Sequence, residues 1–288
     1  VMDTSLIIPD VYKMMEDKGS KLPPEEQEAI IEEFGEECKF FMRDAIGGHQ
    51  DRSGSLRLSG VGHPLRKIWN QYHDIKAKPI TGQTYMKFIF GHLTEAMLLA
   101  IVKLSGHKVT EQQKVCTVEG VKGHQDCRID GVLVDVKSAS SYGFKKFRYN
   151  TLHEDDPFGY IAQLKAYAHE DGDTTVAWLA MDKQNGDLAW LEYNLEDASA
   201  PYFEACDYSI AERVTEIKEA MKGPLPPICY SDIPDGKSGN RKLATGCAYC
   251  DFRETCWTDL RTFSYSGGPR YMTKVVRDPK VREIPVGF

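Results

Sequence analysis

Long hydrophobic runs are missing from this sequence of 288 residues. No window approaches the roughly 18 uninterrupted apolar residues that a membrane span needs, and the first residues lack the basic-then-apolar layout of a signal peptide. We therefore expect no membrane association and a cytoplasmic location. Cysteine is also sparse, because eight residues are too few for a disulfide-stapled secreted scaffold of this length.

An excess of basic residues is absent as well. The chain has 36 Lys and Arg against 43 Asp and Glu, a formal net charge of −7. This balance argues against a protein that coats nucleic acid over its whole surface, but it leaves room for a local basic track. The acidic residues concentrate between Glu25 and Glu37, whereas the tail beyond Asp259 is basic.

Periodicity predicts several elements. Apolar residues recur at helical spacing from Tyr85 to Ser105, and Gly106 follows as a stop signal. Further helices are expected at 23–46, 66–72, 158–169 and 198–222, strand-like segments at 108–119, 122–130 and 132–140, and a hairpin at 174–195 around the type I′ signal Asn185-Gly186. We expect three parts: an N-terminal helical segment (1–54), a core (55–222), and a small cysteine-containing subdomain with a basic tail (223–288).

The segment around Asp130-Gly131 carries the most chemistry. A two-residue hairpin loop there predicts the cross-strand pairs Asp126–Asp135, Arg128–Leu133 and His124–Lys137. Asp126, Asp135 and Lys137 would then share one face. Opposed carboxylates repel unless a cation lies between them, which favours Mg²⁺ or Mn²⁺. The alternative is that these residues form the exposed polar face of an ordinary hairpin.

A third acid favours the first interpretation. Glu95 lies on the predicted helix 85–105, and Leu98 and Val102 occupy neighbouring turns. A glutamate bordered by core residues is less often idle than one on a solvated face. Lys137 could position an attacking water or stabilise charge that builds on a phosphate.

The order of these motifs resembles the PD-(D/E)XK nuclease superfamily, in its RecB-like and lambda-exonuclease-like branch. The matching residues are Glu95, Asp126, Asp135-Val136-Lys137, and Gln163 with Tyr167. Two positions depart from the pattern, because Gln125 precedes Asp126 where the family has proline, and Asp135 replaces the usual glutamate. The resemblance implies an α/β fold with a central mixed sheet flanked by helices, a restriction-endonuclease-like core.

The resemblance also implies roles. Glu95, Asp126 and Asp135 would ligate Mg²⁺ or Mn²⁺, Lys137 would assist the nucleophile, and Gln163 would support the site. Tyr167 is a candidate substrate contact, with core packing as the alternative. The implied function is a DNA exonuclease in phage DNA degradation, replication or recombination, located in the host cytoplasm if phage-encoded. The alternatives are a structure-selective endonuclease and a catalytically silent DNA-binding module. A homo-oligomer and a single-strand-annealing or replication protein are the protein partners considered.

A basic and aromatic segment, Phe144-Lys-Lys-Phe-Arg-Tyr149, follows the Asp-x-Lys strand. Cations for phosphates and rings for bases suit single strands or linear DNA ends, so Lys145, Lys146 and Arg148 are candidate substrate contacts. The alternative is a basic surface strand with core aromatics.

Four cysteines near the C-terminus form the second candidate site: Cys229, Cys247, Cys250 and Cys256. The last three resemble the C-x2-C-x5-C of RecB-like nucleases that carry a [4Fe–4S] cluster, and Cys229 is the natural fourth ligand. Four thiolates could equally hold tetrahedral Zn²⁺. Either metal would act structurally.

Overall fold

The central sheet grows from the hairpin at Asp130 and Gly131. In the computed structural model, which describes residues 3–47, 54–75 and 81–285, these two residues have φ of 51° and 94°. A type I′ turn requires positive φ at both positions. The flanking strands β4 (Cys127–Ile129) and β5 (Val132–Ala139) pair antiparallel with Arg128 opposite Leu133, so this part of the predicted register is confirmed.

The strands of this sheet follow the order β1–β4–β5–β6–β7, with mixed directions. β5 pairs in parallel with β6 (Thr175–Asp182), whereas β1 (Val109–Thr110) and β7 (Leu188–Asn194) pair antiparallel with β4 and β6. A parallel pair needs a long crossover, which here contains α5 (Ser141–Arg148), the 3₁₀ turn η3 (Leu152–Glu154) and α6 (Tyr160–Asp171). The expected α/β fold with a mixed sheet is confirmed.

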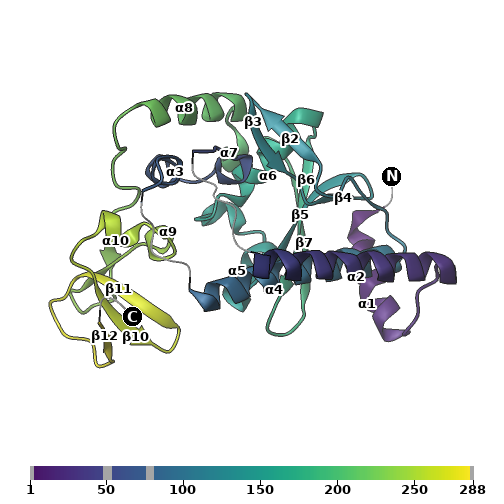
Figure 1. Ribbon diagram of the computed structural model, residues 1–288, viewed down its shortest axis with the longest axis horizontal. Coiled ribbons are helices and arrows are strands. Elements are labelled where there is room, and N and C mark those ends of the chain that lie inside the picture. The colour runs from purple at the N-terminus through teal and green to yellow at the C-terminus, as the bar shows by residue number, and fades with distance from the viewer. Residues whose placement is uncertain (1–2, 48–53, 76–80, 286–288) are drawn as a thin grey trace. The chain divides into compact units, whose positions relative to one another are not determined.

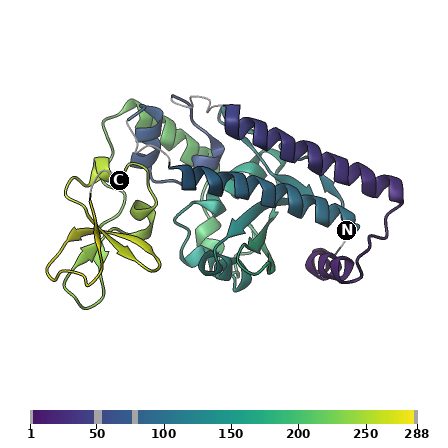
Figure 2. The same ribbon diagram turned by 60° about the horizontal axis from the view of Figure 1, so that its bottom comes forward.

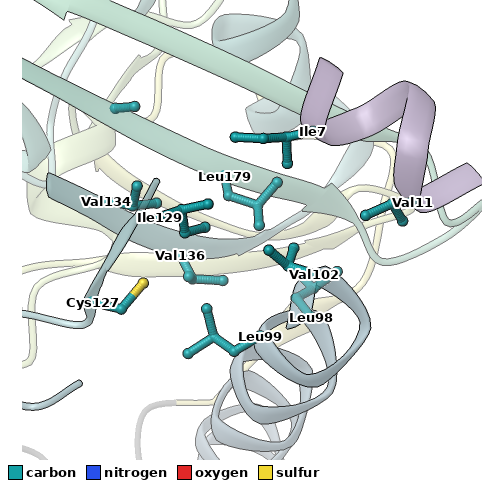
Figure 3. Packing of buried hydrophobic residues seen from close by; sticks show 11 residues of the cluster. Ile7, Val11, Leu98, Leu99, Val102, Cys127, Ile129, Val134, Val136 and Leu179 are labelled. Carbon is teal, nitrogen blue, oxygen red and sulfur yellow. The ribbon is translucent and has the colours of Figure 1, made fainter. Parts of the chain in front are cut away.

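Helices cover both faces of this sheet (Figures 1 and 2). The helix α4 (Gly82–Leu104) and the helix α1 (Ile7–Glu16), which follows the 3₁₀ turn η1 (Thr4–Leu6), pack on one face. Figure 3 shows Leu98 and Val102 of α4 gathered with Val134 and Val136 of β5 in this core. Because side chains alternate along a strand, Asp135 points to the opposite face, where α5 and α6 contact the sheet.

The predicted pair His124–Lys137 is wrong. The chain leaves the ladder before β4, and β3 (Val121–His124) pairs instead with β2 (Val115–Val118), which places His124 opposite Val115. Gly123 packs so closely that a Cβ there would lie 2.6 Å from the Tyr167 ring and 2.7 Å from Leu58. This contact ties the hairpin to α6 and to the 3₁₀ turn η2 (Leu58–Gly60), so tertiary packing decides the pairing.

Two further local predictions are wrong. The single helix expected at 198–222 is two helices, α7 (Phe203–Cys206) and α8 (Ile210–Lys222), because the carbonyl groups of Cys206 and Tyr208 accept hydrogen bonds from Lys165 rather than continuing a helix. The hairpin between β6 and β7 lacks a two-residue type I′ turn. Gly186 has a φ of 81°, but Asn185 is not among the described residues with positive φ.

The chain divides into two compact units, and the described residues of the smaller one are 54–56, 63–75 and 215–285. Its small antiparallel sheet has the order β12–β10–β11–β9–β8. Its elements are α3 (Leu65–Tyr72), β8 (Ile233–Pro234), β9 (Arg241–Lys242), α9 (Thr245–Ala248), α10 (Arg253–Cys256), β10 (Arg261–Tyr265), β11 (Gly268–Lys274) and β12 (Glu283–Ile284). Leu243, Cys247 and Leu260 form its core. The predicted boundaries at 54 and 222 remain predictions.

The helix α2 (Pro24–Gly47) contacts α4 in the larger unit. Among the described residues, α4 is long and apolar enough to cross a membrane, with a mean hydropathy of 1.4 over its best 18-residue window. The C-terminal half of α4 instead contributes Leu98, Leu99 and Val102 to the core. Core helices of soluble proteins pass the same length and composition test, so this finding is weak evidence for a span.

Replacing Gly62 by alanine is expected to destabilise the larger unit. A Cβ on Gly62 would lie 2.5 Å from the Cα of Gly159, which itself has a φ of 73°. The backbone of one segment or the other must move, at a cost of about 2 kcal/mol. The matched control is Gly91→Ala on α4, where a Cβ meets nothing within 4 Å and helix propensity predicts a gain of about 1 kcal/mol. Urea unfolding of both variants measures the difference, and an unchanged midpoint for Gly62→Ala would contradict the packing.

Candidate active site

The strand β5 brings Asp135 and Lys137 to the face of the sheet that α6 covers. Asp135 is 1% exposed, and the Nζ atom of Lys137 lies 2.5 Å from its Oδ2 atom. Residues two apart on a strand point the same way, which is why the Asp-x-Lys spacing produces this ion pair. Burial, followed by the neighbouring Asp126 carboxylate, raises the pKa of Asp135 to about 7 even though Lys137 opposes the shift.

Asp126 lies in the short link between β3 and β4. Its Oδ2 atom accepts a hydrogen bond of 2.8 Å from the Val136 N–H, and its backbone carbonyl accepts one of 3.1 Å from the Gln113 N–H. The link therefore holds the Asp126 carboxylate against β5, close enough for its charge to raise the pKa of Asp135. The β4–β5 ladder begins with Cys127 opposite Val134, so the predicted cross-strand pair Asp126–Asp135 is not formed as a ladder pair.

Glu95 reaches the same cluster from α4. Gln113 donates a hydrogen bond of 3.2 Å from Nε2 to the Oε1 atom of Glu95. Burial, together with the negative charges of Asp126 and Asp135, raises the pKa of Glu95 to about 8. The structure thus gathers three carboxylates from three different elements beside one lysine.

The helix α6 supplies the polar support. Gln163 donates from Nε2 to Asp135 Oδ1 at 3.3 Å and to the Tyr167 hydroxyl at 3.4 Å. Tyr167 is 2% exposed, so its ring packs in the core and does not offer a surface to substrate. We therefore correct its expected role from substrate contact to support of Gln163. Tyr160, one turn earlier, places its ring centroid 4.8 Å from Lys137 Nζ.

Lys137 stays positively charged in this environment. Desolvation by burial lowers its pKa, but the carboxylates of Asp135 and Asp126 outweigh that effect and hold the pKa above its usual range. Lys137 therefore acts as a cation and not as a proton acceptor near neutral pH.

The carboxylates have the chemistry of a site for a divalent cation. Oδ2 of Asp135 is buried and contacts the Lys137 ammonium group at 2.5 Å, and carboxylate oxygens are the ligands that Mg²⁺ and Mn²⁺ prefer. Within residues 3–47, 54–75 and 81–285, no group of three or more His, Cys, Asp or Glu side chains is arranged to hold a metal ion. Binding by all three carboxylates would therefore require side-chain movement from this arrangement.

The predicted basic segment forms the helix α5. Phe144 and Phe147 are each 3% exposed and pack in the core. Lys146 Nζ pairs with Asp155 at 2.6 Å and Arg148 with Asp187 at 2.9 Å. Of the three predicted substrate contacts, Lys145 is exposed and makes no ion pair with a described residue. The alternative interpretation, a basic surface strand with core aromatics, describes Phe144 and Phe147 correctly but is wrong about the strand, because the segment is helical.

The four cysteines of the smaller unit are electrostatic neighbours. Burial raises the pKa of Cys247 to about 11, and Cys229, Cys250 and Cys256 add to the shift. Arg66 of α3 donates from Nε to the Cys256 Sγ atom at 3.2 Å. The thiols are suitable donors for iron or zinc. Like the carboxylates, they are not arranged to hold a metal ion in the part of the chain that the structure describes.

The sequence contains no signal for Gln113, and it indicates a helix face for Tyr160 without a role at the candidate active site. Gln113 holds both the Asp126 backbone and the Glu95 carboxylate, but it lies between strands in no motif. Tyr160 shares a helix face with Gln163 and Tyr167, and this spacing was the available signal. Its packing against Lys137 depends on the fold.

No protein-family model and no curated protein matches the chain. Among solved structures, that of SSO0001 is 16% identical, with 77% of this chain and 93% of that chain covered and a TM-score of 0.43. LHK-Exo, an alkaline exonuclease from Laribacter hongkongensis, is 13% identical over 64% of this chain and 94% of its own, with a TM-score of 0.36. The structure of LHK-Exo in complex with dAMP is 14% identical over 59% of this chain and 90% of that chain, with a TM-score of 0.35. At these identities and TM-scores, we transfer neither family nor function to the chain.

Proposed function

We propose that the chain is a nuclease that hydrolyses phosphodiester bonds of DNA, acting from an end. The observation that carries this proposal is the Lys137–Asp135 ion pair of 2.5 Å, which has the half-buried carboxylates of Asp126 and Glu95 as electrostatic neighbours. Burying Asp135 and partly burying two more carboxylates beside a single lysine is unfavourable for folding, because the charges repel and lose their hydration. Such clusters therefore mark functional sites.

Each charged group has a role that its contacts support. Lys137, held cationic by its neighbours, would orient the attacking water and stabilise the negative charge that grows on the phosphate. The Val136 N–H fixes Asp126, Gln163 fixes Asp135 and Gln113 fixes Glu95. These three carboxylates would hold Mg²⁺ or Mn²⁺, which supplies Lewis-acid activation of water and of the phosphate.

The choice of DNA and of an end comes from the motif order. Glu95, Asp126, Asp135-x-Lys137 and Gln163 follow one another as in the nuclease superfamily that the sequence resembles. Support for a shared site comes from the hydrogen bond between Gln163 and Asp135 and from the charges of Asp126 and Asp135, which raise the pKa of Glu95. An endonuclease would use the same groups, so the substrate decides between the two activities.

The test compares end-labelled linear DNA with a covalently closed circle, each with Mg²⁺, with Mn²⁺ and with EDTA. We expect release of nucleotides from the linear DNA, an intact circle, and no reaction in EDTA. Nicking of the circle would show that the activity is endonucleolytic, which would contradict the exonuclease proposal. If the protein binds DNA but cleaves neither substrate under any of the three conditions, the proposed enzymatic activity is refuted. The protein would then be a DNA-binding module.

We also propose that Cys229, Cys247, Cys250 and Cys256 hold an iron–sulfur cluster or, alternatively, zinc. Support comes from their mutual electrostatic influence and from the Arg66 N–H that points at Cys256 Sγ. Hydrogen bonds to cysteine sulfur are typical around iron–sulfur clusters.

Replacing Cys250 by serine is expected to remove this metal and to lower the thermal midpoint by about 10 °C, because structural metal ligation contributes folding free energy. Metal analysis and acid-labile sulfide on anaerobically purified protein measure the first effect, and calorimetry the second. The control is Cys38→Ser on α2, which should change neither quantity. Equal metal content in both variants would refute the site.

A further inference from the structure

The last segment of the smaller unit, yellow in Figure 1, carries exposed cations that the fold leaves without partners. Residues 274–285 run from the end of β11 through β12 and contain four cations and two acids. Both acids pair with one arginine of β10, because Arg261 Nη2 lies 3.1 Å from Asp278 and 2.7 Å from Glu283. The four cations are exposed and make no ion pair and no side-chain hydrogen bond with a described residue: Lys274, Arg277, Lys280 and Arg282.

A second loop, residues 235–240, adds the exposed Lys237 and is fastened to this segment. The buried Asn240 accepts hydrogen bonds at its Oδ1 atom from the Val276 and Arg277 N–H groups, at 2.7 and 2.9 Å. Its Nδ2 atom donates to the Arg277 carbonyl at 2.8 Å. The loop and the segment therefore form one fixed surface. We call its five cations the tail surface: Lys237, Lys274, Arg277, Lys280 and Arg282.

The acids nearest to the tail surface are already paired with other residues. Asp235 pairs with Arg270 at 3.0 Å, and Asp232 pairs with Arg241 at 2.7 Å. Lys274 is an electrostatic neighbour of Asp232 but makes no ion pair with it. The tail surface thus keeps an uncompensated positive charge in a chain whose net charge is −7. Such a local excess raises the concentration of polyanions beside it, and a backbone that is already fixed loses little conformational entropy when a ligand binds.

We infer that the tail surface binds the phosphate backbone of DNA, as a second contact in addition to the candidate active site. The inference rests on the proposed nuclease function for the identity of the polyanion. The tail surface belongs to the smaller unit, whereas Lys137 and the three carboxylates belong to the larger one. Lys and Arg contacts to phosphates do not depend on base sequence. Val276, the 63% exposed residue beside Arg277, is aliphatic and offers no ring for a base to stack on, which favours phosphates as the groups that are bound.

The experiment measures the affinity of the full chain for a fluorescent DNA oligonucleotide at several salt concentrations, with EDTA present to prevent cleavage. The first variant combines Lys237→Ala, Lys274→Ala and Arg277→Ala. Each lost phosphate contact reduces the slope of log Kd against log salt by about 0.7 to 0.9, so we expect a slope lower by about 2 to 3 and binding at least about 10-fold weaker at 0.1 M salt. Exchanging these residues as Lys237→Arg, Lys274→Arg and Arg277→Lys keeps the charge and should keep the slope.

The matched control removes three exposed lysines that pair with acids on their own helices. Lys13, Lys39 and Lys222 lie 3.3, 2.8 and 2.6 Å from Asp17, Glu36 and Glu219. The combined alanine variant of these three lysines changes the net charge by the same amount as the first variant. We expect it to keep the salt slope of the unmodified protein.

Three outcomes would overturn the inference and leave the proposed nuclease intact. The first is an equal salt slope for the alanine variant of the tail surface and the unmodified protein, with thermal midpoints showing that both are folded. The second is an equal loss in the control variant, because the effect would then come from net charge. The third is a loss of binding to polyglutamate without a loss of binding to DNA, which would identify an acidic protein as the partner. The expected slopes without any cleavage by the unmodified protein would instead refute the nuclease and leave the DNA-binding surface.

Discussion

Lys137→Ala is expected to reduce DNA cleavage by at least about 1000-fold while leaving DNA binding within a few fold of the unmodified protein. The ammonium group lies 2.5 Å from Asp135 Oδ2 and is the cation of the proposed site. Removing one well-placed electrostatic group raises the activation barrier by about 4 kcal/mol, which corresponds to this loss of rate. Single-turnover cleavage with excess enzyme measures the chemical step separately from binding.

The matched control is Lys103→Ala. The side chain of Lys103 is 15% exposed, close to the 18% of Lys137, and it pairs with Glu33 at 2.7 Å. Both variants thus remove a largely buried lysine from a carboxylate, but Lys103 lies outside the carboxylate cluster. We expect Lys103→Ala to retain activity. Cleavage by Lys137→Ala within tenfold of the unmodified rate would show that this cluster is not the catalytic site.

The part of this site that local sequence rules could predict is the part made by local structure. Asp130-Gly131 fixes the β4–β5 register because both residues adopt the positive φ of a type I′ turn. Asp135 and Lys137 then share a face by strand periodicity alone. Gln163 faces Asp135 because α6 covers that side of the sheet.

The remainder depends on contacts between distant segments. His124 leaves Lys137 because Gly123 packs against Leu58 and Tyr167, two residues far away in the chain. Lys165 donates hydrogen bonds to the carbonyl groups of Cys206 and Tyr208, between the two helices that replace the one expected at 198–222. Helix propensities do not include such contacts with a distant side chain. Lys146 and Arg148, candidate DNA contacts by sequence, are paired with Asp155 and Asp187 by the fold.

The metal-free protein is expected to lose stability as the pH rises from about 5 to 8. The native pKa values of Glu95 and Asp135 are raised from 4.5 and 3.8 to about 8 and about 7, in both cases first by burial and then by neighbouring carboxylates. In this interval the native state therefore binds more protons than the unfolded state, which makes the free energy of unfolding fall with increasing pH. Together the two groups contribute on the order of 3 kcal/mol.

Calorimetry at several pH values in EDTA measures this effect, which should lower the thermal midpoint by about 10 °C at pH 8 relative to pH 5. Glu95→Gln should flatten the dependence, because an amide carries no charge at any of these pH values. Glu28→Gln, at an exposed position on α2, is the control and should leave the slope unchanged. Mg²⁺ or Mn²⁺ binds the deprotonated carboxylates, so it should raise the midpoint more at pH 8 than at pH 5. The contradicting result would be the same pH slope in Glu95→Gln and in the unmodified protein, together with no response to either cation. That result would mean that these carboxylates do not destabilise the native state at high pH and do not bind the metal.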